Sequence, residues 1–168
     1  MTLQLSAFSS TGYAFGVDVR GIGETLSLNC DFYGDNFFHA YGSDYHYNSI
    51  SLMFGESLLI QRMRDLLAAI AFVKARGVKK IHLAGRGQGT LVALFTALVC
   101  EDVRSVKLFD APESYAKMVK DRITLWPHSV MVRNILKYTD LPEIYEALQN
   151  AGKLTIVNYA DNLIQQEL

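Results

Sequence analysis

One stretch of the sequence decides the fold: Ile81-His-Leu-Ala-Gly85-Arg-Gly87-Gln-Gly89-Thr90-Leu-Val-Ala-Leu94. A short apolar run, typical of a buried strand, passes into an apolar helical pattern through a turn with three glycines at alternate positions. Such a turn lets the chain reverse tightly between a strand and the helix that follows it. The stretch therefore predicts a strand–turn–helix unit of an α/β protein.

Strands and helices alternate on both sides of this turn. Short apolar runs bounded by turn residues predict buried strands, and longer periodic runs predict helices. We expect strands at residues 13–19, 80–84, 105–109 and 154–158, and helices at residues 57–76, 90–100 and 141–149. This alternation predicts right-handed βαβ units and a mostly parallel sheet with flanking helices, in a single domain over residues 1–168.

Local signals set several boundaries. In the helix expected over residues 57–76, an apolar stripe runs from Leu59 to Val73, and Arg62 is assigned to the other side. Gly77 follows as the expected stop of that helix, and Pro142 lies in the first turn of the last one. The aromatic segment 21–55 shows no clear period, so we expect a long irregular loop there.

Composition excludes several classes of protein. The chain has 168 residues, 50% of them hydrophobic, and a net charge of −1, which excludes a disordered chain and a basic nucleic-acid interface. No run reaches the roughly 18 apolar residues that a membrane span needs. Residues 1–6 lack the basic and apolar regions of a signal peptide, so we expect a cytoplasmic protein. Cys30 and Cys100 fit no metal-binding or redox motif, and we expect neither a metal nor a cofactor.

The glycine turn has two interpretations. In the first it binds a dinucleotide, whose pyrophosphate sits on the helix N-terminus. Gly85 and Gly87 match the first two glycines of GxGxxG, but Thr90 replaces the third. Asp110 follows at the distance expected of a ribose-binding acid. This alternative stays open, although the turn does not follow the first strand of the chain.

In the second interpretation the turn is the nucleophile elbow GxSxG of α/β-hydrolases, where the nucleophile lies at a sharp strand-to-helix corner. Gly85 and Gly89 match the flanking small residues. Gly87 occupies the position of the serine.

The surrounding sequence resembles the acetyl xylan esterases and cephalosporin-C deacetylases of the α/β-hydrolase superfamily. The segment Gly-Tyr-Ala-Phe-Gly-Val-Asp-Val-Arg-Gly-Ile-Gly-Glu at residues 12–24 is similar to the strand and turn that precede the elbow unit in that family. Tyr45-His46-Tyr47 and the following helix resemble its approach to the elbow, which is of the GxSQGG type. The resemblance extends over roughly residues 10–161, and its most specific parts are DVRGxGE and GxGQG.

The resemblance implies a partial α/β-hydrolase-like three-layer sandwich with a damaged active site. Glycine at position 87 has no side chain to attack a substrate, and such a loss costs on the order of 10⁶ in rate in a serine hydrolase. The backbone N–H of Gln88 corresponds to an oxyanion donor, and Asp161 corresponds to the acid of the triad. No histidine follows Asp161. We therefore expect a catalytically inactive domain with a binding or structural role.

A second functional alternative is an active carboxylic-ester hydrolase, a carbohydrate acetyl esterase with a non-standard or partner-supplied site. Under either reading, the resemblance implies a carbohydrate or acyl ligand in a groove beside the glycine turn. The candidate ligand-binding residues are Arg86, Gln88, Tyr45, His46, Asp110 and His128.

The expected topology has a consequence for partners. If the four strands lie in sequential order, every right-handed crossover puts its helix on the same face of the sheet. The opposite face is then expected to be bare and apolar, although parallel sheets are almost always covered on both faces. This predicts either a homo-oligomer or a chain that is part of a longer parent protein.

Overall fold

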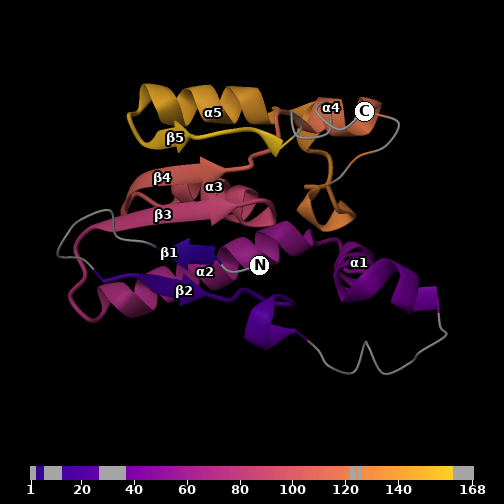
Figure 1. Cartoon of the computed structure of the whole chain (residues 1–168), viewed down its shortest axis with the longest axis horizontal. Coiled ribbons are helices and arrows are strands. Elements are labelled where there is room, and N and C mark those ends of the chain that lie inside the picture. The colour runs from indigo at the N-terminus through magenta and orange to yellow at the C-terminus, as the bar shows by residue number, and fades with distance from the viewer. Residues whose placement is uncertain (1–2, 6–12, 27–36, 122–123, 125, 161–168) are drawn as a thin grey trace.

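A computed structural model describes residues 3–5, 13–26, 37–121, 124 and 126–160 of the chain (Figure 1). Strands and helices alternate through most of it, as an α/β protein requires. The strands are β1 (Leu3–Leu5), β2 (Phe15–Val17), β3 (Ile81–Arg86), β4 (Val103–Phe109) and β5 (Leu154–Ile156). The α-helices are α1 (Phe37–Met53), α2 (Leu58–Lys74), α3 (Gln88–Val99), α4 (Tyr115–Lys120) and α5 (Leu141–Asn150). Short 3₁₀ helices are η1 (Gly23–Thr25), η3 (His128–Val130) and η4 (Ile135–Lys137).

The central sheet is parallel and has the order β3-β4-β5. Leu83 pairs with Val106 and Gly85 with Leu108, and Val106 in turn pairs with Leu154. The apolar residues of these strands form one core with α3, which is buried nearly all round from Gly89 to Ala97. The expected parallel sheet with flanking helices is confirmed, with three strands.

The fourth expected strand lies elsewhere. The expected run at residues 13–19 shortens to β2, which pairs with β1 in an antiparallel two-stranded sheet. Its expected place in the parallel sheet is therefore wrong. Alternation of side chains predicts a strand well, but pairing partners depend on contacts between distant segments that a local pattern does not encode.

The largest error concerns residues 37–53, which form helix α1 rather than an irregular loop. The sequence of α1 contains a glycine, three tyrosines and several serines, all weak helix formers, and its apolar residues do not gather on one side. Its end does carry a signal, because Gly55 adopts a φ of 76° and its N–H donates to the Leu52 carbonyl.

Two boundaries predicted from local chemistry are confirmed. Gly77 has a φ of 89°, and its N–H donates to the Lys74 carbonyl, which closes α2. Helix α5 begins at Leu141 with Pro142 in its first turn and Asp140 as its N-cap.

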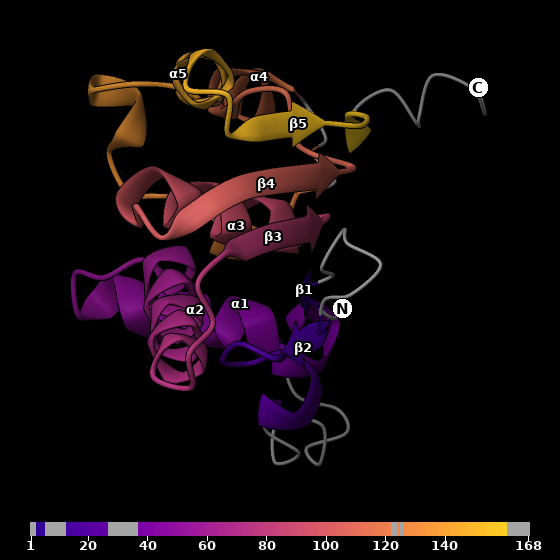
Figure 2. The same cartoon turned by 90° about the vertical axis from the view of Figure 1, so that its left-hand side faces the viewer.

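Helices α2, α3 and α5 lie on one side of the parallel sheet (Figure 2). For α3 and α5, which connect β3 to β4 and β4 to β5, sequential strand order with right-handed crossovers requires this placement. The other face carries the alternate residues His82, Ala84, Ser105, Lys107, Phe109 and Thr155. The expected apolar character of this face is therefore wrong, since four of these six side chains are polar and Ala84 alone among them is buried. Strand alternation puts the apolar residues under the helices instead.

Asp140 ties together the starts of two helices. Its carboxylate accepts hydrogen bonds from the N–H of Leu141 (2.7 Å), from the N–H of Tyr115 (2.7 Å) and from the Ser114 hydroxyl (2.6 Å). Burial raises the pKa of Asp140, but these hydrogen bonds outweigh burial and hold the pKa below its usual value.

We expect Asp140→Asn to lower the free energy of unfolding at pH 7 by about 1 kcal/mol, the usual value of an N-cap. Because the pKa is lower in the folded state, the carboxylate stabilises the fold at neutral pH, and this stabilisation is lost as the pH falls below about 4. The free energies of unfolding of the unmodified protein and of Asp140→Asn, measured with urea, should therefore become equal at acid pH. The exposed Glu146→Gln on the same helix is the control; equal losses from both variants at pH 7 would contradict the capping role.

None of the helices in the described part of the chain is long and apolar enough to cross a bilayer.

Candidate functional site

The glycine turn lies at the carboxyl end of β3, where the chain enters α3. Gly87 is the N-cap of α3 and has a φ of 54° and a ψ of −125°, a backbone conformation that residues with a side chain rarely adopt. The Thr90 hydroxyl donates to the Gly87 carbonyl at 2.5 Å, and the Gly87 N–H donates to the Phe109 carbonyl at 3.1 Å. The turn is therefore sharp, adopts a backbone conformation that favours glycine, and is held by hydrogen bonds on both sides.

Gly85 and Gly89 pack backbone against backbone in this turn. A Cβ added to Gly85 would lie 2.5 Å from the Gly89 carbonyl oxygen and 2.9 Å from the Thr90 Cα. Only glycine fits at position 85, because the strand and the helix approach each other too closely for any side chain. This close packing two residues before and after the corner is what the small residues of a nucleophile elbow provide.

Three polar residues meet at the carboxyl edge of the parallel sheet. Asp110 follows β4, and its carboxylate accepts from Arg86 Nε at 2.6 Å and from the Asn158 side-chain amide. The Asp110 N–H donates to Asn158 Oδ1 at 3.0 Å. The Arg86 guanidinium, followed by the Asn158 amide, outweighs burial and holds the pKa of Asp110 below its usual range. In open α/β sheets, ligands bind at this edge.

A buried arginine connects the turn to the rest of the site. The side chain of Arg62, on α2, is 1% exposed. It forms an ion pair with Asp44 of α1 at 2.6 Å, donates to the Arg20 carbonyl at 3.0 Å and donates to Gln88 Oε1 at 3.3 Å. Arg62 thus joins the segment after β2, helix α1 and the first residue of α3.

The segment that follows β2 is held against α2. Arg20 forms an ion pair with Asp65 at 2.5 Å, and its backbone N–H donates to the same carboxylate at 3.0 Å. Asp18 accepts from the Glu24 N–H at 3.1 Å, which orders the turn. The DVRGxGE segment therefore positions Arg62, and through Arg62 it reaches Gln88.

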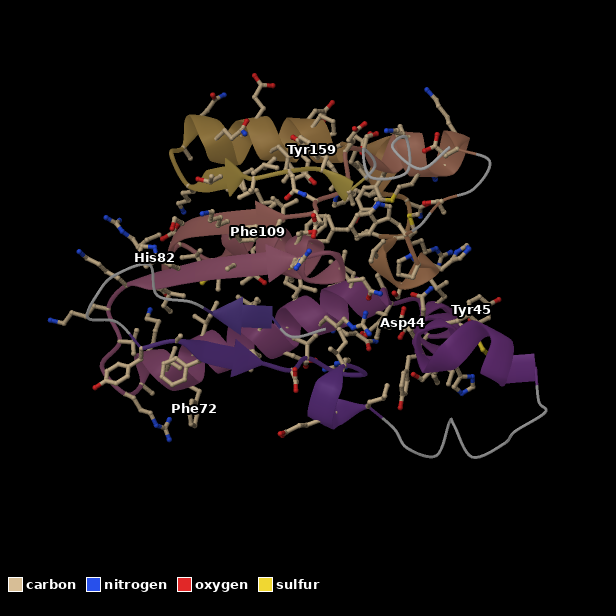
Figure 3. The ribbon with its side chains drawn as sticks, in the orientation of Figure 1. Asp44, Tyr45, Phe72, His82, Phe109 and Tyr159 are labelled. Atoms are coloured by element: carbon tan, nitrogen blue, oxygen red, sulfur yellow. The ribbon has the colours of Figure 1, made fainter. Side chains whose placement is uncertain are left out.

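Helix α1 and η3 lie at the same end of the molecule as the carboxyl ends of β3 and β4 (Figure 1). Tyr45 and His128 meet edge to face, with ring centroids 6.3 Å apart, and His46 lies beside Tyr47 with ring centroids 6.4 Å apart. Figure 3 labels Asp44 and Tyr45 on α1.

Unpaired polar atoms gather where α1 meets η3. Among the described residues, four side-chain oxygens are buried without a hydrogen-bond partner, and three of them, Asp44 Oδ2, Asn48 Oδ1 and Ser129 Oγ, belong to α1 and η3, whereas the fourth, Asp18 Oδ1, follows β2. Buried polar atoms are nearly always paired in a core that serves only stability. This concentration therefore distinguishes the α1–η3 region from the apolar packing under α3.

The structure brings most of the predicted site residues to one end of the molecule. Arg86, Gln88 and Asp110 lie around Gly87, and Tyr45 and His128 join them through Asp44 and Arg62. The candidate acid Asp161 lies outside the described residues. Arg62, Asp44 and Asn158 were not expected here, and the assignment of Arg62 to the solvent side of its helix is wrong.

A sequence signal for Arg62 does exist. The buried residues Leu58, Arg62, Leu66 and Ile70 recur every four positions along α2. A charged residue inside such a row marks a buried group that needs partners. Asn158 has no comparable signal, because it contacts Asp110 from the segment that follows another strand, β5.

Comparisons of the chain with protein-family models, with curated proteins and with solved structures find no match.

Proposed function

We propose that this chain is an α/β-hydrolase-like domain, similar to acetyl xylan esterases, that binds a carbohydrate or acyl ligand at the carboxyl edge of its sheet without hydrolysing it. The observation that carries the proposal is the turn at Gly87. It combines the sharp corner, the close packing of its flanking glycines and the neighbouring helix N-terminus with a residue that has no side chain.

The polar groups around the turn support a hydroxyl-bearing ligand. Arg86 is exposed and offers donors beside the carboxylate of Asp110, which offers acceptors. A sugar supplies both donors and acceptors from each hydroxyl. Of the histidines whose side chains the structure describes, His82 contacts Ser105 at 2.7 Å, His128 packs against Tyr45, and His46 packs beside Tyr47. None of these contacts places an imidazole as a base for the corner.

The dinucleotide alternative receives less support. The carboxylate of Asp110, which would have to bind a ribose hydroxyl, is already shared between Arg86 and Asn158. Thr90, at the position of the third glycine, is fully buried, and its hydroxyl donates a hydrogen bond to the Gly87 carbonyl rather than facing a ligand.

We expect no hydrolysis of p-nitrophenyl acetate by the chain above the buffer rate, and none by Gly87→Ser, because the serine would have no base. Circular dichroism should show that the variant is folded. If the unmodified chain hydrolysed the ester, and substitution of one histidine abolished that activity, the proposal of an inactive domain would be refuted.

Binding is the positive half of this test. Acetylated xylo-oligosaccharides titrated in a calorimeter should bind. The Arg86→Gln substitution should weaken their binding by about fivefold or more, as the loss of a charged hydrogen bond does. Arg104→Gln, at the opposite end of the neighbouring strand, makes the same charge change away from the site and should leave binding unchanged. Equal effects of the two variants would show that the ligand does not use this edge.

A further inference from the structure

We propose that the chain binds an amphipathic carboxylate, of the class of medium-chain fatty acids, in a second pocket between β2, α2 and the start of β3. The pocket has a volume of about 440 Å³, within the range of ligand sites. It is lined by the amino end of β3, Ile81 and His82, whereas Gly87 follows the carboxyl end of the same strand. The two sites are therefore separate, and this proposal stands independently of the first.

The interior of the pocket is apolar. Ile70 and Ile81, both nearly fully buried, form its floor, and Phe15, Phe72 and Val73 form its walls. Phe15 is 47% exposed and Phe72 is 58% exposed, although both are large apolar side chains. An exposed apolar surface of this kind, hollowed and bounded by polar groups, marks a binding site. An acyl chain seated there would cover the aromatic rings and remove them from water.

The charges around the pocket have a single sign. Among the described residues that line it, the ionisable side chains apart from the Tyr13 phenol are Arg76, Lys80 and His82, and none is a carboxylate. Arg76 lies over the Phe72 ring, 3.4 Å from the centroid, and donates to the Phe72 carbonyl at 3.2 Å. Neither Arg76 nor Lys80 forms an ion pair with a carboxylate in the described part of the chain. Phe72 and His82 lie at the same end of the molecule (Figure 3).

This arrangement matches one ligand chemistry. An apolar interior calls for a hydrocarbon chain, and a rim of unpaired cations calls for an anionic head group. A carboxylate at the end of an acyl chain supplies both. A sugar would leave the aromatic walls exposed to water, and a neutral hydrocarbon would leave the cations without an anionic partner.

Calorimetry with dodecanoate below its micellar concentration tests the proposal on the full chain. We expect one molecule to bind, with the affinity rising about tenfold for each two methylenes from octanoate to dodecanoate. The double variant Arg76→Gln/Lys80→Gln should weaken the binding of dodecanoate about tenfold or more and leave the binding of the neutral methyl dodecanoate unchanged. Lys79→Gln removes the same kind of charge from the residue next to Lys80, outside the pocket, and should change binding less than twofold.

A second variant tests the interior. Ala69→Phe fills the pocket and should abolish binding of both the acid and the ester, while circular dichroism and the melting temperature show that the domain is intact. Because the rim variant changes only exposed side chains, it decides the matter even where Ala69→Phe does not fold. Three results would overturn the proposal: no saturable binding up to 1 mM dodecanoate, equal affinity for acid and ester, or a dimer that dissociates when Ala69 is replaced, which would assign the pocket to a second copy of the chain.

Discussion

Replacing Arg62 with methionine should destabilise the domain by about 3–5 kcal/mol, the usual cost of removing one partner of a buried ion pair. The substitution keeps the length of the side chain and removes the guanidinium, which leaves Asp44 without its ion pair and the Arg20 carbonyl and Gln88 without their donor. For a domain of this size, the loss corresponds to a fall of about 10 °C in the melting temperature.

Urea unfolding followed by far-UV circular dichroism measures this effect. The matched control is Arg64→Met, two residues away on the same helix, where the exposed side chain pairs with an exposed Glu56. We expect its midpoint to stay where it is in the unmodified protein, because exposed ion pairs contribute little. If both variants unfolded at the same urea concentration, Arg62 would not connect α1, α2 and the turn as described.

Gly85→Ala should cost about 3 kcal/mol, the upper part of the usual range for overpacking. The added methyl group would meet backbone atoms of Gly89 and Thr90, and backbone cannot turn away as a flexible side chain can. The strand and the helix would have to separate, which would also shift the corner at Gly87.

Gly77→Ala is the control for this prediction. Gly77 has a φ of 89° but no atom within 4 Å of an added Cβ, so its substitution costs only the strain of the backbone, about 1 kcal/mol. Thermal unfolding of the two variants separates steric conflict from backbone strain. A Gly85→Ala variant as stable as Gly77→Ala would mean that β3 and α3 lie farther apart than the contacts of Gly85 with Gly89 and Thr90 indicate.

The parts of the fold that could be predicted are those governed by local chemistry. The strand that ends near Gly85 is visible because most of its residues are buried and apolar, and the helix after Gly87 is visible because it is buried nearly all round. Gly77 and Pro142 mark helix boundaries through their own backbone preferences, which do not depend on the rest of the chain.

The parts that could not be predicted depend on contacts between distant residues. Helix α1 is built from weak helix formers, so it is stabilised by contacts with α2 and η3, and these are invisible in its own sequence. The pairing of β2 with β1 is non-local in the same way. Within the candidate site, Gln88 was predicted from the resemblance of the glycine turn to a nucleophile elbow and Asp110 from its place after a strand, whereas Arg62 and Asn158 required knowledge of which elements pack together.

The glycine at position 87 also bears on how such a domain can evolve. Its backbone lies in a region that costs a residue with a side chain on the order of 1–3 kcal/mol, and glycine adopts that region without this penalty. A chain that gives up the nucleophile therefore recovers stability, and a chain that regains it must first have stability to spare. Under the proposed function, glycine at the corner would make the loss of the nucleophile easy to fix in evolution and hard to reverse, while the shape of the proposed binding edge would be preserved.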